Sequence, residues 1–528
     1  MNLEFGWFPG CFARADPGLL EECAALYSNH YGTWSAQAPP PGSPGSPVRL
    51  SAARLKRWFD SDDSRIAVAR AGSEMVGYAI AGQMKAPRCG VVSWVTQLVV
   101  HESYRRRNVG KRLLFSIWGM SNHFAWGLVT ASPYAVRALE KATRRRCRPA
   151  RIKRSNRRLH QLGCEHVGYV NEQTEIDVGP GRSRIRTDFF LDHTDVGEMI
   201  AQARSDDKPW LLGSLPEGWE WFAFTFSDQD QLRLSSTEIA TMLEASDQIT
   251  RQAYARMTLD HEHRWARHTA KESREIIQYC QVEPGQAVLD FGCGAGRHAI
   301  ELARSGMRVT GVDYARELVE KADSKAKKLG VPGTRFLTAD CRDVPLHEVF
   351  DAAVCLYDVV GTYADLESNA RIVANLAHHL KPGGFALVSV MNLASTRSRA
   401  RQVFSVAEEP DRLLQLPPSN IMETTGDIFD PDYFMLDEHS NVVYRKEQFT
   451  RGSDLPTELI VRDRRFSTDE ITTVCGDAGL QVVWTRPVRA GRWEQRLDEL
   501  DNRAKEILVL CRKLPRGGPE RSAAVHGP

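Results

Sequence analysis

The sequence lacks any apolar run that approaches the ~20 residues needed to span a bilayer. Its first residues, Met1–Phe5, have neither the basic flank nor the apolar core of a secretory signal. The 11 cysteines form no C-x-x-C pair, and their odd number argues against a closed disulfide framework. These absences predict a cytoplasmic protein with reduced thiols, no zinc site and no membrane partner.

An excess of either charge is also missing. The chain has 69 Lys and Arg residues against 67 Asp and Glu residues, which leaves a formal net charge of +2. The overall charge therefore favours no particular class of partner. A hydrophobic content of 42% and a charged content of 26% are typical of a globular protein. At 528 residues the chain exceeds one ordinary core, so more than one domain is expected.

The most informative glycines form one turn. Val288–Phe291 has the pattern of a buried strand, and His298–Ala303 that of a helix start. Between them lie an acid and three alternating glycines: Asp290, Gly292, Gly294 and Gly296. Glycines let a backbone approach a ligand, and a helix N-terminus favours a carboxylate or phosphate. A second strand ends in Asp313, 23 positions further on (313 minus 290), where an acid can hold a ribose.

This acid-G-x-G-x-G pattern resembles the first motif of class I S-adenosylmethionine-dependent methyltransferases, whereas a dinucleotide-binding turn reads G-x-G-x-x-G. The resemblance implies a Rossmann-like α/β domain. It implies that Asp290 faces the cofactor ammonium, the turn amides its carboxylate and Asp313 its ribose hydroxyls. Later segments fit the family in order: Phe336–Asp340, Phe350–Asp358, and the turn Leu380–Gly384 before the strand Phe385–Val390.

The same resemblance implies further cofactor contacts and an acceptor site. Asp340 is expected to contact the adenine amine, and the cofactor-binding set is completed by Tyr314, Cys341 and Leu356. Tyr357, Asp358 and Tyr254 are the catalytic candidates, because the fourth strand of this family ends over the reacting methyl group and the preceding helices cover the cofactor. A buried structural role for each is equally open. The surroundings of Tyr357 resemble N-methyltransferases of small amines and amino sugars.

A second motif lies in the N-terminal part. Alternation over Arg65–Ala81 predicts a β-hairpin, and Val91–Val100 a long central strand. After that strand, Arg105, Asn108 and Gly110 occupy the marked positions of [Q/R]-x-x-G-x-[G/A], the pyrophosphate loop of GNAT acetyltransferases. Asparagine tolerates the positive φ for which the family uses glycine. The resemblance implies acetyl-CoA binding by Leu98, Val100, Arg105, Asn108, Gly110 and Lys111.

Acyl transfer itself is less clearly indicated than acetyl-CoA binding. Many GNAT enzymes place a tyrosine on the helix after the fifth strand to protonate the departing thiolate. The count from Ser132 places Leu139 at that position, and leucine cannot give a proton. Another acid, solvent, or a CoA-binding module without catalysis are the alternatives.

The segment Lys141–Arg158 holds ten Lys and Arg residues among eighteen, with no acid between them. Such a density is an electrostatic footprint for phosphates, either of RNA or of the CoA 3′-phosphate. A solvated face or a docking strip explains it equally well. The run contains no aromatic residue on which a single-stranded base would stack. Because the basic run could bind an RNA backbone, an RNA-modifying methyltransferase is an alternative function.

We therefore predict an α/β protein with a GNAT-like domain over 1–190 and a class I methyltransferase domain over 236–513. Residues 191–235 are expected to form a connector with an aromatic strand, and 514–528 a disordered tail. The spacing of His261, His263 and His268 fits no usual metal-ligand pattern. The predicted function is bifunctional: methyl transfer to an amine or hydroxyl of a small molecule, and acetyl-CoA-dependent N-acyl transfer.

Overall fold

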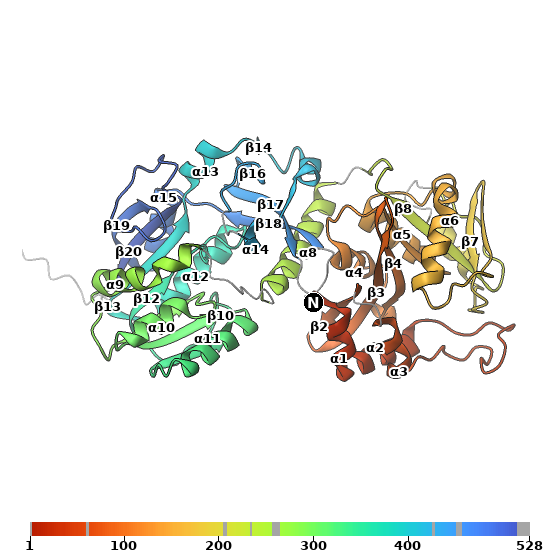
Figure 1. The fold of residues 1–528 in the computed structure, drawn as a ribbon, viewed down its shortest axis with the longest axis horizontal. Helices are drawn as coiled ribbons and strands as arrows, with labels where there is room; N and C mark the ends of the chain where they lie inside the picture. The colour runs from red at the N-terminus through yellow and green to blue at the C-terminus, as the bar shows by residue number, and fades with distance from the viewer. Residues whose placement is uncertain are drawn as a thin grey trace, which may run out of the picture. The chain divides into compact units, whose positions relative to one another are not determined.

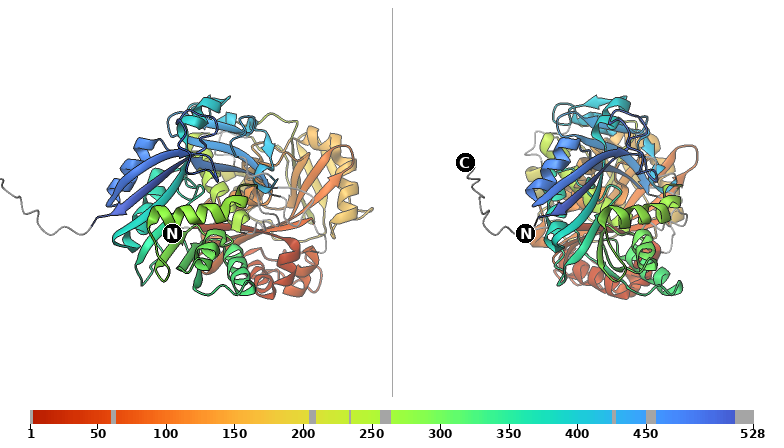
Figure 2. Two further views of the ribbon diagram at one scale, coloured as in Figure 1. Left: turned by 60° about the vertical axis from the view of Figure 1, so that its left-hand side comes forward. Right: turned by 90° about the vertical axis from the view of Figure 1, so that its left-hand side faces the viewer.

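The computed structural model describes residues 3–59, 63–203, 209–232, 235–255, 264–424, 428–449 and 457–514. The predicted tail beyond residue 514 and His261 and His263 lie outside this range. The chain divides into two compact units, which can be followed by colour in Figures 1 and 2. Unit 1 comprises Met1–Thr250 with Gln448–Leu459, and unit 2 comprises Arg251–Glu447 with Ile460–Pro528. Within the described ranges, no helix is both long enough and apolar enough to cross a membrane.

Unit 1 is built on an eight-stranded sheet with the order β1-β2-β3-β4-β5-β8-β7-β6. Its strands are β1 (Leu3–Pro9), β2 (Ser64–Ala71), β3 (Glu74–Ala86), β4 (Gly90–Val100), β5 (Ala125–Thr130), β6 (Ile176–Gly179), β7 (Arg182–Arg186) and β8 (Trp219–Phe226). The predicted hairpin and central strand are confirmed as β2–β3 and β4. All neighbouring strands are antiparallel except β4 and β5, which are parallel.

The aromatic strand β8 lies inside this sheet, between β5 and β7. Its side chains are buried on both faces, and Phe222, Phe224 and Phe226 are fully buried. A strand that pairs on both sides needs apolar residues on both faces, which explains the density of aromatic rings. Unit 1 therefore continues past residue 190, whereas the sequence predicts a connector over 191–235.

Helices cover both faces of the first sheet. On one face lie α1 (Gly10–Ala15) and α2 (Pro17–His30), which begins where Asp16 Oδ1 accepts the Leu19 amide at 3.0 Å ahead of Pro17. On the other lie α4 (Val109–Trp118) and α5 (Pro133–Thr143). The remaining helices of this part are α3 (Ala52–Leu55), α6 (Pro149–His166), α7 (Val196–Ala203) and α8 (Ser236–Ala255), which ends in unit 2.

The late segment Gln448–Leu459 is an integral part of unit 1. The buried Arg65 guanidinium donates to the Ile117 carbonyl at 3.1 Å and to the Thr457 hydroxyl. The Met120 amide donates to the Glu458 carbonyl at 2.7 Å. Because buried polar groups need partners, this segment completes the surface over β2 and α4.

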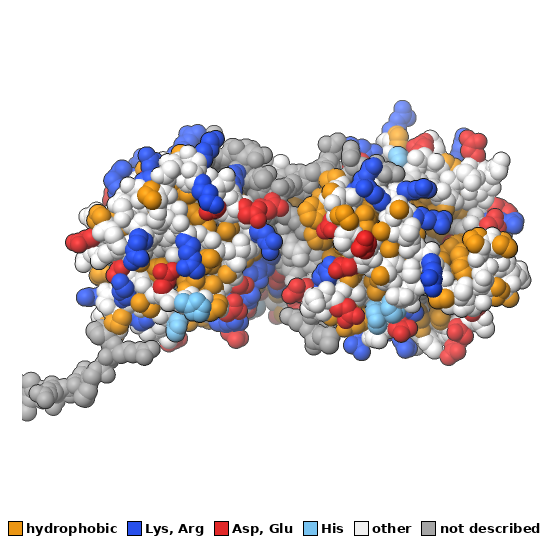
Figure 3. Space-filling model, turned by 90° about the horizontal axis from the view of Figure 1, so that it is seen from below, with side chains coloured by type: hydrophobic (Ala, Val, Ile, Leu, Met, Phe, Trp, Pro, Cys, Tyr) orange, Lys and Arg blue, Asp and Glu red, His pale blue; other side chains and the backbone are white. Residues whose placement is uncertain are grey.

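The basic segment Lys141–Arg158 folds into the end of α5 and the start of α6, and much of it is turned inward. Four of its ten basic side chains are buried: Arg144, Arg145, Arg146 and Arg151. Arg146 pairs with Glu140 at 3.3 Å, and Arg151 with Asp228 at 2.9 Å. On the face in Figure 3, Lys and Arg side chains are scattered among acidic and apolar ones. The predicted RNA-binding strip is therefore not supported, because internal contacts use these arginines.

Unit 2 contains a seven-stranded sheet with the order β11-β10-β9-β12-β13-β20-β19. Its strands are β9 (Ala287–Phe291), β10 (Arg308–Asp313), β11 (Thr334–Thr338), β12 (Phe350–Cys355), β13 (Leu380–Met391), β19 (Leu480–Val488) and β20 (Glu506–Lys513). The strands from β11 to β13 are parallel, and β20 and β19 are antiparallel additions. This confirms the predicted Rossmann-like order, in which ligands bind beyond the carboxyl ends of the central strands.

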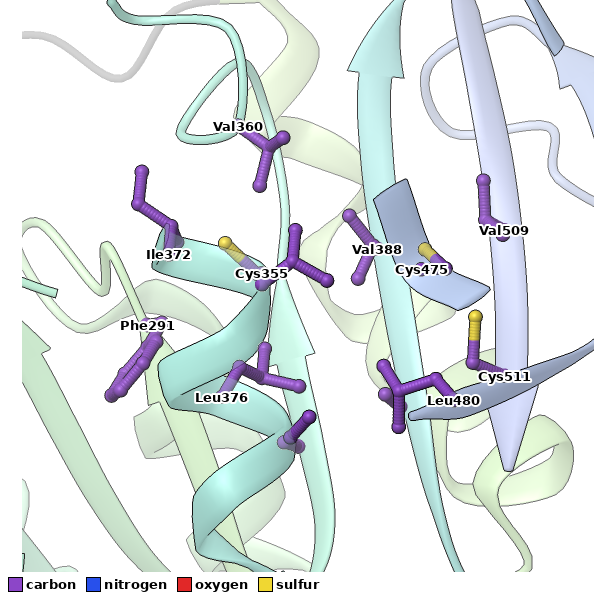
Figure 4. Close-up of a cluster of buried hydrophobic side chains, with 14 of the residues drawn as sticks. Phe291, Cys355, Val360, Ile372, Leu376, Val388, Cys475, Leu480, Val509 and Cys511 are labelled. Carbon is purple, nitrogen blue, oxygen red and sulfur yellow. The ribbon is translucent and has the colours of Figure 1, made fainter. Parts of the chain in front are cut away.

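Two hydrophobic layers hold the second sheet. One face packs on α9 (Thr269–Cys280), α10 (Arg297–Arg304) and α11 (Arg316–Lys328). The other packs on α12 (Leu366–His379) and α15 (Thr468–Asp477). Figure 4 shows the second layer, where Phe291, Cys355 and Val388 lie near Ile372 and Leu376 of α12. The burial of both faces explains why these strands read as continuous apolar runs.

The segment between β13 and α15 forms a separate small sheet. Its strands are β14 (Val403–Phe404), β15 (Pro418–Ser419), β16 (Phe434–Asp437), β17 (Val442–Phe449) and β18 (Thr457–Arg464). The segment also contains α13 (Leu393–Arg399) and α14 (Ile421–Thr424).

Candidate functional site

The glycine turn after β9 adopts a conformation that other residues would strain. The φ angles of Gly292, Gly294 and Gly296 are +73°, +51° and +75°. A Cβ at Gly292 would lie 2.2 Å from Val359, and one at Gly296 2.9 Å from Ala322, so these two glycines permit close packing. A Cβ at Gly294 would meet no atom within 4 Å. The turn is therefore packed at its two ends and open in the middle, where a ligand can approach.

The amides of this turn are used within the protein. Gly292 and Cys293 donate to the Val312 carbonyl at 2.8 and 3.1 Å, and Gly296 donates to the Cys293 carbonyl at 2.9 Å. Gly294 donates to Asp313 Oδ2 at 2.9 Å. The sequence predicts that these amides face a cofactor carboxylate. In the structure the amides of Gly292, Cys293, Gly294 and Gly296 have partners within the protein, and the contact with a cofactor carboxylate stays a prediction.

Asp313 is fixed at the carboxyl end of β10. Its Oδ2 accepts the Gly294 amide and its Oδ1 accepts the Ala315 amide, both at 2.9 Å. Only 8% of the residue is exposed. Each carboxylate oxygen has a further lone pair, so the group can still accept from two vicinal hydroxyls. This orientation suits the ribose contact that the sequence predicts for Asp313.

Asp290 carries a buried carboxylate oxygen that lacks a partner. The residue is 3% exposed, and its Oδ2 has no hydrogen-bond partner among the described residues. Burial raises the pKa of Asp290 to about 7, against the opposing effect of Arg297. A buried acceptor without a donor is costly, so this site favours a ligand that brings a cationic N–H group.

Asp340 lies between two arginines. Arg251 and Arg342 each reach its Oδ2 at 2.9 Å, and the Arg251 guanidinium lies 5.1 and 4.9 Å from the ring centres of Tyr314 and Tyr363. Burial opposes ionisation, but the hydrogen bonds from Arg342 and Arg251 hold the pKa of Asp340 well below its usual value. Asp340, which the sequence assigns to the adenine amine, thus pairs with two guanidinium groups in this structure.

The remaining two residues of the predicted cofactor set lie in the hydrophobic cores on opposite faces of the sheet, Cys341 on the α12 face and Leu356 on the α9 face. Cys341 is 8% exposed and its thiol donates to the Val312 carbonyl at 3.8 Å. Leu356 is 5% exposed and follows β12 directly. Both side chains are therefore buried near the carboxyl ends of the strands.

Unit 1 has its own opening, between β4 and β5. Their pairing ends at Val95 and Leu128, although β4 continues to Val100 and β5 to Thr130. The predicted acetyl-CoA residues Leu98 and Val100 lie on the part of β4 that pairs with β3 but no longer with β5. Diverging parallel strands expose backbone donors and acceptors that an extended ligand can pair with.

The loop after β4 leads into α4 through a left-handed residue. Asn108 has φ +61° at the N-cap of α4, which confirms that asparagine fills the position as glycine would. Arg105 donates to the Val100 carbonyl at 3.2 Å and to the His30 carbonyl, so its guanidinium helps to close the loop. Lys111 is 6% exposed, and burial lowers its pKa. Gly110 lies close to α5, with Ala138 3.6 Å from the position of a Cβ.

Replacing Asn108 by valine is expected to lower the unfolding free energy by roughly 1–2 kcal/mol, because a β-branched residue is strained at positive φ. Asn108→Gly is expected to be nearly neutral. Urea unfolding of both variants measures the difference. Equal stability of the valine and glycine variants would show that this loop does not need a left-handed residue.

Comparison with known proteins agrees with both halves of this description. Residues 288–384 match the model of the methyltransferase domain family, and residues 31–117 match the acetyltransferase (GNAT) family. A ubiquinone biosynthesis O-methyltransferase of Rickettsia prowazekii (strain Madrid E) is 34% identical over 105 residues, which are 20% of this chain and 40% of that enzyme. The chain thus spans less than half the length of that curated relative.

Two further relatives match over longer segments. A dTDP-4-amino-2,3,4,6-tetradeoxy-D-glucose N,N-dimethyltransferase of Saccharopolyspora spinosa is 29% identical over 225 residues, which are 42% of this chain and 83% of that enzyme. An uncharacterized methyltransferase of Synechocystis sp. (strain ATCC 27184 / PCC 6803 / Kazusa) is 30% identical over 189 residues, 34% of this chain and 76% of that protein. The chain belongs to the methyltransferases. It carries in addition a GNAT acetyltransferase domain, so the predicted fusion is confirmed.

In this methyltransferase, the predicted catalytic pair Tyr357 and Asp358 follows β12 in a strained conformation. Their φ angles are +60° and +65°, which non-glycine residues adopt at a cost of ~1–3 kcal/mol each. The Tyr357 amide donates to Ser389 Oγ at 2.8 Å, and its hydroxyl donates to Glu272. Asp358 pairs with Arg465 at 3.4 Å. This backbone conformation places the Tyr357 ring at the carboxyl edge of the sheet and turns the Asp358 carboxylate toward Arg465.

The third candidate, Tyr254, shares two charged neighbours with Asp358, namely Arg445 and Asp463. It is half-buried near the end of α8, and burial raises its pKa. Its electrostatic neighbours are Arg445, Glu447, Asp463 and Tyr314. The structure therefore groups Tyr254 with charged side chains of β17 and β18 that also face Asp358.

A buried polar cluster around Tyr357 was not predicted from the sequence. Glu272 of α9 is fully buried, and its Oε2 lies 3.0 Å from Arg297 Nη1 and 2.9 Å from His298 Nε2. Burial opposes ionisation, but these partners lower the pKa of Glu272 to about 2. Burial and Arg297 lower the pKa of His298 to about 4, so its imidazole is neutral at pH 7. No motif contains Glu272, because its partners come from another segment of the chain.

A second unpredicted carboxyl lies on β8 of the GNAT domain. Glu220 is 5% exposed and accepts hydrogen bonds from the Thr187 hydroxyl and the Ala131 amide, just past the point where β5 leaves β4. Burial raises its pKa to about 7. Three tyrosines lie within its electrostatic reach: Tyr27, Tyr31 and Tyr169. The available signal was a single acid within an otherwise apolar, aromatic strand.

Proposed function

We propose that unit 2 transfers a methyl group from S-adenosylmethionine to an amine or hydroxyl of a small molecule. The observation that carries this proposal is the unpartnered, buried Asp290 Oδ2 beside the fixed Asp313 carboxylate and the open face of Gly294. The bound cofactor supplies an electrophilic methyl carbon on a sulfonium. The three residues fit its ammonium and ribose hydroxyls.

In this proposal the protein acts mainly by alignment. Asp313 accepts from the ribose hydroxyls and Asp290 from the ammonium. Asp340, Tyr314 and Tyr363 would hold the adenine. Tyr357 lies at the edge where the fourth strand ends. Its hydroxyl oxygen orients the acceptor, and its O–H group donates a hydrogen bond to Glu272. Holding two reactants in line accounts for much of the acceleration that such an enzyme needs.

The relatives support both acceptor chemistries. The Rickettsia relative is named for O-methyl transfer and the Saccharopolyspora relative for N,N-dimethyl transfer to an amino sugar. We therefore propose a small-molecule acceptor with an amine or a hydroxyl group.

Calorimetry and labelling test this function together. The full chain should bind S-adenosylhomocysteine with micromolar or tighter affinity, and incubation with ¹³C-methyl S-adenosylmethionine and a cell extract should yield a labelled small molecule. Absence of binding heat with both S-adenosylhomocysteine and S-adenosylmethionine would contradict the proposal. Label found only in RNA would instead favour an RNA-modifying enzyme.

We further propose that unit 1 binds acetyl-CoA and transfers the acyl group to an amine. The divergence of β4 from β5 and the left-handed Asn108 before α4 support the binding. Leu139 is fully buried and has no proton to give. Glu220 lies beside the divergence, and its carboxylate can take a proton from the attacking amine. The sequence offered no candidate for this general base.

Glu220→Gln is expected to lower the rate of acetyl transfer roughly 100-fold at pH 7. A base with a pKa near 7 is active in its ionised form, so the wild-type rate should rise with pH through about 7, and the variant should lose that rise. Glu217→Gln, an exposed acid just before β8, is the control. Rates measured with acetyl-CoA and a panel of amines decide the point. An unchanged pH profile would exclude Glu220 as the base.

A further inference from the structure

Three buried carboxyl groups on the α9 face of the second sheet lie within electrostatic reach of Arg297. Asp290 comes from β9, Glu272 from α9 and Glu506 from the start of β20. Their exposed fractions are 3%, 0% and 3%. Burying several carboxyl groups together is costly unless cations or donors satisfy them.

Arg297 is the one cation that faces all three groups within the part of the chain that the structure describes. It is committed to Glu272 at 3.0 Å and lies over the Tyr357 ring at 4.3 Å. His298 is neutral near pH 7, because its pKa is lowered to about 4. The protein therefore provides one positive charge for three carboxyl groups.

Glu506 is the member of this cluster without an assigned role. It accepts a hydrogen bond from Ser389, and its Oε2 has no partner among the described residues. The charged groups that face it are Glu272 from α9, Arg297 from α10 and Asp358 after β12. Burial and Glu272 raise the pKa of Glu506 to about 8, with Arg297 opposing. An unpartnered oxygen of a deeply buried side chain points to a ligand that brings a donor.

The position of Glu506 connects it to the acceptor. Ser389 bonds both the Glu506 carboxyl and the Tyr357 amide, so the two residues share one support. Glu506 also acts electrostatically on the Tyr357 hydroxyl. If methyl transfer is correct, the cofactor ammonium satisfies Asp290, and Glu506 is left for the second substrate.

We propose that Glu506 binds the ammonium group of the methyl acceptor and removes its proton, which makes the acceptor a primary or secondary amine. This inference rests on the methyl transfer proposed for unit 2. The ionised form of Glu506, whose fraction grows as pH rises through about 8, is the one that acts. The ammonium N–H bond breaks and its proton joins this carboxylate, so the rate should rise with pH over the same range. The nitrogen lone pair then forms the N–C bond as the S–C bond of the methyl donor breaks. The product leaves as an N-methylated ammonium ion, and Glu506 releases the proton to water.

The first experiment identifies the atom that is methylated. The full chain is incubated with ¹³C-methyl S-adenosylmethionine and a cell extract, and the carbon shift of the transferred methyl group is read by NMR. An N-methyl product is expected. An O-methyl or C-methyl product would overturn the assignment to Glu506 and leave methyl transfer itself intact. Binding of S-adenosylhomocysteine without any labelled product would contradict methyl transfer and this inference together.

The second experiment measures matched variants with the fraction of the cell extract that contains the methylated acceptor. Glu506→Gln keeps the shape of the side chain and is expected to lower kcat/KM about 100-fold at pH 7. Its Kd for S-adenosylhomocysteine should stay within about twofold of wild type. Glu275→Gln, a second carboxyl on the same α9 layer that hydrogen-bonds Glu494, is the control and should keep full activity.

An infrared measurement gives a readout that does not depend on turnover. Wild type should show the C=O band of a buried protonated carboxyl at pH 7, which is lost as pH rises through about 8 and is absent from Glu506→Gln. Full activity of Glu506→Gln, or a more than tenfold weaker Kd for S-adenosylhomocysteine, would overturn the proposal. The second result would place Glu506 at the cofactor.

Discussion

Replacing Asp313 by alanine is expected to weaken binding of S-adenosylhomocysteine about 1,000-fold, because two charge-assisted hydrogen bonds to the ribose are lost. The carboxylate is already held in place by the Gly294 and Ala315 amides, so no ordering cost offsets these bonds. The variant also leaves those two amides without their acceptor. Isothermal titration of wild type and variant at equal pH and salt measures the change.

The matched control for this variant is Asp323→Ala on α11. Asp323 is an exposed aspartate that pairs with Lys327, and its loss should alter the Kd less than twofold. Because the Asp313 variant also loses the support of the turn, its urea unfolding should be measured beside the titration. A folded Asp313→Ala protein with wild-type affinity would show that the nucleoside sugar lies elsewhere.

Replacing Glu272 by glutamine is expected to lower the unfolding free energy of unit 2 by about 3–5 kcal/mol, because a buried charge loses its counter-charge. Glu272 is fully buried and receives bonds from Arg297, His298 and Tyr357. Glutamine keeps the volume, but it leaves the arginine without a carboxylate. Urea unfolding followed by circular dichroism at pH 7 is the measurement.

The pH dependence of this effect has a definite sign. The pKa of Glu272 falls from 4.5 to about 2 on folding, so its ionised form stabilises the protein above pH 4.5. That stability is lost as pH falls from 4.5 toward 2, and the difference between wild type and Glu272→Gln should shrink over the same range. Glu275→Gln is the control, since the pKa of Glu275 is raised to about 7 and its neutral form is already favoured. A constant difference across that pH range would contradict the charge network.

The sequence predicted the turn of unit 2 because its chemistry is local. Asp290 lies in β9, the three glycines form the turn that follows it and Asp313 ends β10. The positive φ of each glycine favours that residue type. What the turn does with its amides was not predictable, because their acceptors depend on the register of β9 with β10. The resemblance predicts a ligand at this turn but could not assign each donor.

The polar cluster around Tyr357 was beyond sequence reasoning for a different reason. Glu272 and Glu506 are separated by more than two hundred residues and lie on a helix and a strand that read as ordinary packing elements. Their relation depends on the order of the sheet, in which β20 pairs with β13. For Glu506 the available signal was a charged residue at the start of an apolar strand, and such residues are usually surface groups. Glu272 lies among other charged residues of α9 and gave no such signal.

Unit 1 shows the same contrast. Asn108 could be assigned because a left-handed position restricts the residue types that fit. The role of β8 could not, because the aromatic pattern indicates burial without saying which strands lie beside it. Its insertion between β5 and β7 brings Glu220 to the opening and extends the first unit beyond the predicted boundary.

The assignment of Gln448–Leu459 to unit 1 has a practical consequence for dissecting the protein. The polypeptide leaves unit 1 after Thr250, returns to it for Gln448–Leu459, and then continues in unit 2. No single scission can therefore yield two intact halves. A fragment that stops at residue 250 would expose the Arg65 guanidinium that Thr457 normally covers. The contribution of each activity is best separated by point substitutions in the full-length chain.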